Sequence, residues 1–176
     1  MKHYVVTLIL FLTAFTTFAQ NKTSFPKDFT GHWQGTLQWY AQGADTPRTV
    51  NMELNIKPHP DSAGQYTWHI IYGQPGQDSR PYILKPVDPA KGHWVIDEVN
   101  GIILDQYWIG GKFAGAFTVG TVTIVNSYWI EHGQLQVEFY SYPPKPLATT
   151  GKGTDDSPRV DSYQIRSYQR AVLSKK

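Results

Sequence analysis

The chain has 176 residues, a formal net charge of +2, 14% aromatic residues and no cysteine. Its lysines and arginines are mixed with acidic residues, whereas nucleic acids and anionic membranes require a concentrated basic surface. The lack of cysteine excludes a disulfide-stapled module. We therefore expect a domain that is held together by its own core and has no nucleic-acid partner.

The amino-terminal segment has the three parts of a secretory signal peptide. Lys2 and His3 form a short basic start, an apolar stretch runs from Tyr4 to Phe18, and Ala19 ends a site of small residues. The apolar stretch covers about 15 residues, which is shorter than the roughly 20 that a spanning helix needs. We expect residues 1–19 to be a signal peptide, residues 20–29 to be a tail, and the mature protein to be periplasmic or secreted without a membrane span.

Hydrophobic residues alternate with polar ones from Gly31 onward, which is typical of strands with one face in a core and one in water. In the first such stretch, Trp33, Leu37 and Trp39 share one face. Turn-forming residues separate the alternating stretches. The expected strands cover residues 31–39, 50–57, 66–72, 82–87, 93–96, 102–109, 113–119, 122–130, 135–142 and 162–173.

The connections between these strands are short, which favours an up-and-down meander. Asn100-Gly101 is the strongest signal for a two-residue hairpin turn. A twisted sheet of about ten strands tends to close on itself. The fold class we predict is all-β, a single antiparallel up-and-down β-barrel over residues 30–174; a β-sandwich of the same strands is the alternative.

One segment has no alternation. Residues 143–159 are rich in proline, glycine and threonine. They are expected to form a long, mobile loop at one rim of the barrel, either a functional lid or a disordered connection.

The first and last strands carry a short pattern seen in a known superfamily. Gly31-His32-Trp33 resembles the Gly-x-Trp signature of the lipocalin and calycin superfamily, in which an arginine of the last strand packs over that tryptophan. The resemblance implies a lipocalin-like barrel and assigns the arginine to Arg166 or Arg170. It also implies that Trp33 closes the barrel floor.

Aromatic residues on the inward face of the strands are the candidate ligand-binding residues. A barrel of ten strands is wider than one of eight, which already holds a small ligand. Large aromatic side chains partly fill such an interior and partly offer flat surfaces to a ligand. The candidates are Trp39, Tyr66, Trp68, Tyr72, Tyr82 and Trp94.

Three acidic residues flank the Asn100-Gly101 turn. Asp97 or Glu98 is expected to approach Asp105 across the hairpin, and paired carboxylates can carry acid–base chemistry or a hard cation. Alternation turns Glu98 inward and Asp97 outward. Glu98 is thus the one candidate for a catalytic residue.

Metal and nucleophile motifs are missing from the sequence. His32, His59, His69, His93 and His132 lack the spacing of metal ligands, and there is no cysteine or Gly-x-Ser-x-Gly elbow. We expect neither a metal nor a cofactor.

Three functional hypotheses follow from these residues. The leading one is a non-catalytic, exported barrel that binds a small apolar or amphipathic molecule. The second is an enzyme, a hydrolase or isomerase, that uses a carboxylate in the same cavity. The third is a carbohydrate or protein interaction module with an outward aromatic patch at Tyr40, Trp129 and Tyr140.

Overall fold

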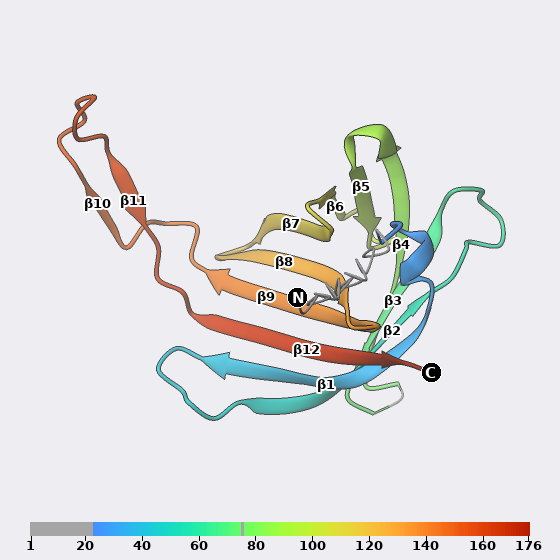
Figure 1. Cartoon of the computed structure of the whole chain (residues 1–176). Helices are drawn as coiled ribbons and strands as arrows, with labels where there is room; N and C mark the ends of the chain where they lie inside the picture. Colours follow the sequence, from blue (N-terminus) through green and yellow to red (C-terminus); the bar gives the residue numbers. More distant parts are fainter. Residues whose placement is uncertain (1–22, 75) are drawn as a thin grey trace, which may run out of the picture.

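The computed structural model describes residues 23–74 and 76–176, and over these residues ten strands close into one antiparallel barrel (Figure 1). Neighbours in the barrel are neighbours in the sequence from β1 to β9, and β12 closes the ring between β9 and β1. The up-and-down barrel predicted from alternation is therefore confirmed, and the sandwich alternative is wrong. The predicted signal peptide, residues 1–19, lies outside the described residues.

The strand bounds agree with the alternating stretches to within a few residues at most ends. The barrel strands are β1 (Gly31–Ala41), β2 (Arg48–Ile56), β3 (Tyr66–Tyr72), β4 (Asp78–Asp88), β5 (His93–Asp97), β6 (Ile103–Ile109), β7 (Lys112–Val119), β8 (Val122–Glu131), β9 (Gln134–Tyr142) and β12 (Ser167–Lys175). Two short 3-10 helices, η1 (Lys27–Phe29) and η2 (Pro89–Lys91), precede β1 and β5. β4 begins earlier than expected because Asp78 to Arg80 pair with the end of β3.

The last strand of the barrel is paired along its whole length with the first strand. Trp33, near the start of β1, lies opposite Lys175 at the end of β12. The backbone N–H of Lys176 donates to the carbonyl of His32 over 2.9 Å. The chain thus enters and leaves the barrel at the same end, as Figure 1 shows.

Inward-facing side chains at this end form a dense aromatic plug. Phe25, which precedes η1, stacks on Trp108 and Phe113 with ring centroids 5.0 and 4.4 Å apart, and meets Trp94 edge-on. Phe29 is fully buried in the same cluster. Part of the segment expected to be a tail is therefore folded into the barrel end, where aromatic burial stabilises it.

The cation over Trp33 is a lysine, which corrects the arginine assigned by resemblance. Trp33 is 2% exposed, and its indole N–H donates to the carbonyl of Phe29 over 2.7 Å. Lys175 Nζ lies 5.2 Å from the ring centroid. Arg170 lies opposite Gln38, in the middle of β1, because antiparallel register places only the end of β12 beside the start of β1. Arg166 lies before β12 and donates its backbone N–H to Ser141.

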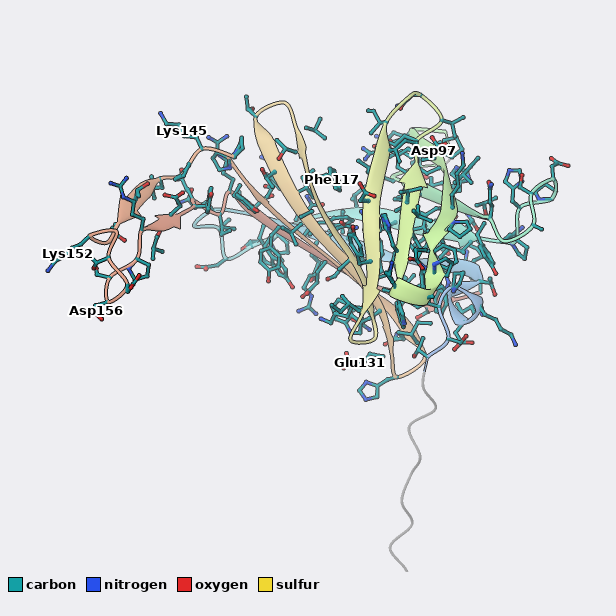
Figure 2. All side chains as sticks on the ribbon, turned by 90° about the horizontal axis from the view of Figure 1, so that it is seen from above. Asp97, Phe117, Glu131, Lys145, Lys152 and Asp156 are labelled. Atoms are coloured by element: carbon teal, nitrogen blue, oxygen red, sulfur yellow. The ribbon has the colours of Figure 1, made fainter. Side chains whose placement is uncertain are left out.

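The segment between β9 and β12 contains a short two-stranded hairpin with a long tip. β10 (Ala148–Thr150) pairs with β11 (Val160–Ser162), and the pair projects from the barrel (Figure 1). Figure 2 shows Lys152 and Asp156 near the tip of this hairpin, far from Glu131 at the β8–β9 turn. Its mobility stays a prediction, which hydrogen exchange can test.

The described part of the chain holds no helix that is both long and apolar enough to cross a membrane.

Candidate functional site

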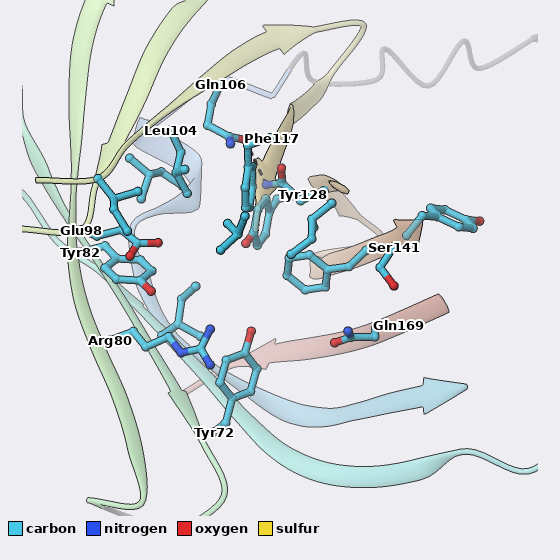
Figure 3. Close-up of a pocket in the computed structure, with 18 residues that line it drawn as sticks. Tyr72, Arg80, Tyr82, Glu98, Leu104, Gln106, Phe117, Tyr128, Ser141 and Gln169 are labelled. Atoms are coloured by element: carbon cyan, nitrogen blue, oxygen red, sulfur yellow. Dashed lines mark hydrogen bonds between the residues drawn. The ribbon is translucent and has the colours of Figure 1, made fainter. Parts of the chain in front are cut away.

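A cavity of about 350 Å³ occupies the end of the barrel away from the plug (Figure 3). Its volume is at the lower end of the range for small-molecule sites, about 300–1,000 Å³. Apolar side chains form most of the wall, and they include Ile70, Ile96, Leu104, Phe117, Ile124 and Phe139. Polar side chains join them at two levels, one at the mouth and one deeper in the barrel.

The cavity lies where two neighbouring strands part. β6 and β7, both fully described, pair only from Tyr107 opposite Ala114 to the turn at Gly110-Gly111. Beyond these pairs, Leu104 of β6 and Phe117 of β7 both line the cavity. The open seam between β6 and β7 therefore widens the interior at this end.

An ion pair and two tyrosines form the mouth. Arg80 makes two hydrogen bonds of 2.9 Å to Asp78, and its guanidinium carbon lies 5.0 Å from the centroid of the Tyr72 ring. Burial raises the pKa of Tyr72 to about 12, against a smaller opposing effect of Arg80. Burial also raises the pKa of Tyr82, and the negative charge of Glu98 raises it further. The mouth tyrosines are therefore neutral at physiological pH.

Glu98 lies at the mouth because the β5–β6 turn is longer than Asn100-Gly101 alone. Asp97 pairs with Ile103, and the N–H of Glu98 donates to the carbonyl of Ile102 over 3.0 Å, so the chain turns over residues 98–102. Figure 3 shows the Glu98 carboxylate beside Tyr82, on the same side of the cavity mouth. The inward orientation expected from alternation thus extends one residue beyond the end of β5.

Two amide side chains form the deeper polar group, the amide pair Gln106 and Asn126. Both are buried, with exposed fractions of 0% and 3%, and both line the cavity. Asn126 Nδ2 donates to Gln106 Oε1 over 3.0 Å. Gln106 Nε2 and Asn126 Oδ1 have no protein hydrogen-bond partner. A buried amide that lacks a partner is costly, so the pair is unusual in an apolar wall.

Gly115 makes room for this pair. Gly115 is on β7 and pairs with Asn126 of β8. It comes directly after Ala114, the last residue of β7 that pairs with β6. A Cβ atom at this position would lie 2.3 Å from Gln106 Nε2, which is closer than any real contact. The backbone at Gly115 has ordinary strand geometry, so a glycine is needed here for the missing side chain and not for an unusual backbone conformation.

The structure divides the six predicted ligand-binding aromatics into three groups. Tyr72 and Tyr82 line the cavity. Trp68 and Trp94 are buried in the hydrophobic core, and Tyr66 is partly buried against that core. Trp39 is half-buried on β1, with the Arg48 guanidinium 5.3 Å from its ring centroid.

The acidic residues of the β5–β6 hairpin have separate partners. Asp97 binds Lys85, which is the first cause of the lowered pKa of its carboxyl group. Asp105 binds His93 over 2.6 Å on the outer face. The expected pairing of Asp97 or Glu98 with Asp105 is therefore not formed. Within the described residues, no group of three His, Asp or Glu side chains could hold a metal ion.

Sequence reasoning missed Arg80, Gln106 and Asn126. Arg80 preceded the expected start of its strand. Gln106 lies between Leu104 and Trp108 on the inward face of β6, and Asn126 occupies the equivalent position on β8. A polar residue at an inward position of an apolar face was the signal that could have identified both.

The outward aromatics are only partly brought together. Tyr168 stands between Tyr40 and Tyr140, with ring centroids 6.0 and 4.9 Å away. Tyr168 also donates to Glu138 over 2.6 Å. Trp129 is apart from them and lies under the Lys112 ammonium at 3.8 Å. The three rings are cross-strand pairs that stabilise the sheet.

The sequence matches no known family and no curated protein at a significant level. Among solved structures, the chain is similar to a protein of unknown function from the DUF3598 family of Nostoc punctiforme, with a TM-score of 0.60 and 14% identity. The match covers 85% of this chain and 48% of that protein, so the chain spans about half the length of its structural neighbour. At this identity the similarity supports the fold alone, and a lipocalin-like barrel is compatible with it.

Proposed function

We propose that this barrel binds a small amphipathic molecule in the cavity at its open end. The observation that carries the proposal is the buried amide pair, whose unpartnered donor and acceptor line an otherwise apolar cavity. Ligand sites combine an apolar wall with a few polar groups that fix orientation. The apolar wall supplies affinity, and the amide pair determines which ligands are preferred.

Binding can be tested with a neutral fluorescent probe, N-phenylnaphthylamine, added to the purified protein. We expect its fluorescence to rise on binding. Phe117→Trp on β7 and Ile124→Trp on β8 narrow the cavity and should weaken binding. Val125→Trp, on the outer face of β8, serves as the control. Equal binding by all four proteins would place the probe elsewhere and contradict the proposal. Native mass spectrometry of the protein from its own source complements this by showing whether a small molecule co-purifies.

A second candidate is catalysis with Glu98 as a general base. The inward position of this carboxylate beside Tyr82 favours it, since a base must reach the cavity that holds the substrate. Glu98→Gln keeps the shape and removes the proton chemistry. Turnover that is lost in Glu98→Gln with binding intact would establish an enzyme; binding without turnover on any candidate substrate supports a carrier.

We also propose that the protein is exported. The signal-peptide pattern of residues 1–19 supports this. Amino-terminal sequencing of the mature protein tests it, and the expected first residue is Gln20. A mature chain that begins at Met1 or Lys2 would contradict it.

A further inference from the structure

The amide pair restricts which ligands the cavity can hold. Its one internal hydrogen bond uses one donor and one acceptor, and leaves Gln106 Nε2 as a free donor and Asn126 Oδ1 as a free acceptor. If both amides were rotated by half a turn, the bond would run from Gln106 to Asn126, and one donor and one acceptor would again be free. The pair therefore offers a donor next to an acceptor in either orientation.

The architecture fixes where this donor and acceptor lie. Gln106 comes from β6 and Asn126 from β8, and they meet across β7 because Gly115 has no side chain. This meeting point is at the inner end of the open seam between β6 and β7. A ligand that enters the cavity would present its leading end to the pair and its trailing end to the mouth.

The charges at the mouth argue against an anionic ligand. Within the described residues, the charged side chains that line the cavity are Arg80 and Glu98. Asp78 already pairs with Arg80 through two hydrogen bonds and offsets its positive charge. The three groups together carry one net negative charge, so a carboxylate or phosphate would be repelled.

We infer that the ligand is an uncharged molecule whose buried end carries an acceptor next to a donor, as an amide or lactam does, on an aromatic or aliphatic body. This inference rests on the proposed binding function and names its ligand class. The ligand's carbonyl oxygen accepts from the free amide N–H, and its N–H donates to the free carbonyl oxygen. Phe117, Phe139 and Tyr128 contact the body. Such a ligand satisfies both buried groups at once, which a ketone or an alkane cannot do.

Three probes of equal size test the ligand class: hydrocinnamamide, hydrocinnamate and benzylacetone. They share one phenylpropanoyl body and end in an amide, a carboxylate and a methyl ketone. Protein-observed amide NMR titration of the full chain gives each affinity and shows which strands are affected. We expect hydrocinnamamide to bind roughly tenfold more tightly than benzylacetone, and hydrocinnamate to bind most weakly.

Variants of the pair show whether it is the source of this preference. Gln106→Leu and Asn126→Leu should each bring the affinity for hydrocinnamamide down to that for benzylacetone. Gln136→Leu removes an amide from the outer face of β9, between the buried residues Leu135 and Val137, and should leave the preference unchanged. Gly115→Ala, which displaces the Gln106 amide without removing it, replaces any leucine variant that fails to fold.

The outcomes separate the two proposals. Equal affinity of the amide and the ketone, or a preference that survives in Gln106→Leu and Asn126→Leu, would overturn the inferred ligand class and leave cavity binding intact; the pair would then be satisfied by buried water. Tightest binding of hydrocinnamate would overturn it as well. If none of the three probes and no N-phenylnaphthylamine binds in the cavity, the proposed function itself fails.

Discussion

The two ends of the barrel interior solve the same packing problem differently. The plugged end is filled by aromatic rings that contact one another, including two from the segment before β1. The cavity end has a similar apolar wall, but its strands part at the seam between β6 and β7, and an amide pair is buried in the wall. The plug shows that aromatic side chains can fill the interior of this barrel where no cavity is kept.

The difference between the two ends separates residues that stabilise the barrel from residues proposed to bind a ligand. In the plug, the indole N–H of Trp33 donates to the carbonyl of Phe29. The buried indole N–H of Trp68, which packs between Phe113 of the plug and Tyr128 of the cavity wall, has no partner among the described residues. The cavity end retains unpartnered polar atoms at a cost in stability. Residues that reduce stability are the ones to examine for function.

Truncation of an aromatic side chain at each end should give unequal losses. Trp33→Ala removes a buried ring from the plug and should cost about 3–5 kcal/mol of unfolding free energy. Phe117→Ala, at the cavity, should cost about 1–2 kcal/mol because that ring already borders open space. Urea denaturation measures both. Equal losses would remove the distinction between the two ends.

Replacing one member of the amide pair should destabilise more than replacing both. Asn126→Leu leaves Gln106 without its partner and should cost about 1–3 kcal/mol. The double variant Gln106→Leu/Asn126→Leu removes both polar groups and should be close to the wild type in stability, or above it. A double variant that loses as much as the sum of the singles would show that the pair stabilises the fold.

Alkaline pH should act on the cavity end. The pKa of Tyr72 is about 12 in the folded protein and about 10 when unfolded, so the unfolded state loses its proton first. This stability is fully present below pH 10 and is lost as the pH rises to 12; at pH 11 the loss is about 1 kcal/mol. Denaturation between pH 9 and 11 should therefore be less pH-dependent in Tyr72→Phe. A parallel pH dependence in both proteins would contradict this.

The smallest effect concerns the cation at the barrel floor. Lys175→Met should cost under about 1 kcal/mol, since an exposed cation–π contact is worth about 0.5–1 kcal/mol, and it should alter the fluorescence of Trp33. Arg170→Met, on the same strand, should leave that fluorescence unchanged. The reverse result would restore the arginine that the resemblance implied.

The strands could be predicted from sequence because alternation is local, whereas the site depends on contacts between distant strands. Inward positions such as Trp33, Tyr72 and Glu98 followed directly from period two. The amide pair did not, because Gln106 meets Asn126 only across β7. Lys175 was missed for the same reason: the register of β12 against β1 decides which cation reaches Trp33.

The paired ends of the chain also give the molecule a direction. β1 begins and β12 ends side by side at the plugged end, and the cavity opens at the other. An affinity tag or an immobilising linker joined after Lys176 would hold the barrel with its mouth pointing away from the support. Surface-based binding measurements on this protein can therefore be made without blocking ligand entry, and a linker at the β10–β11 hairpin would reverse that geometry.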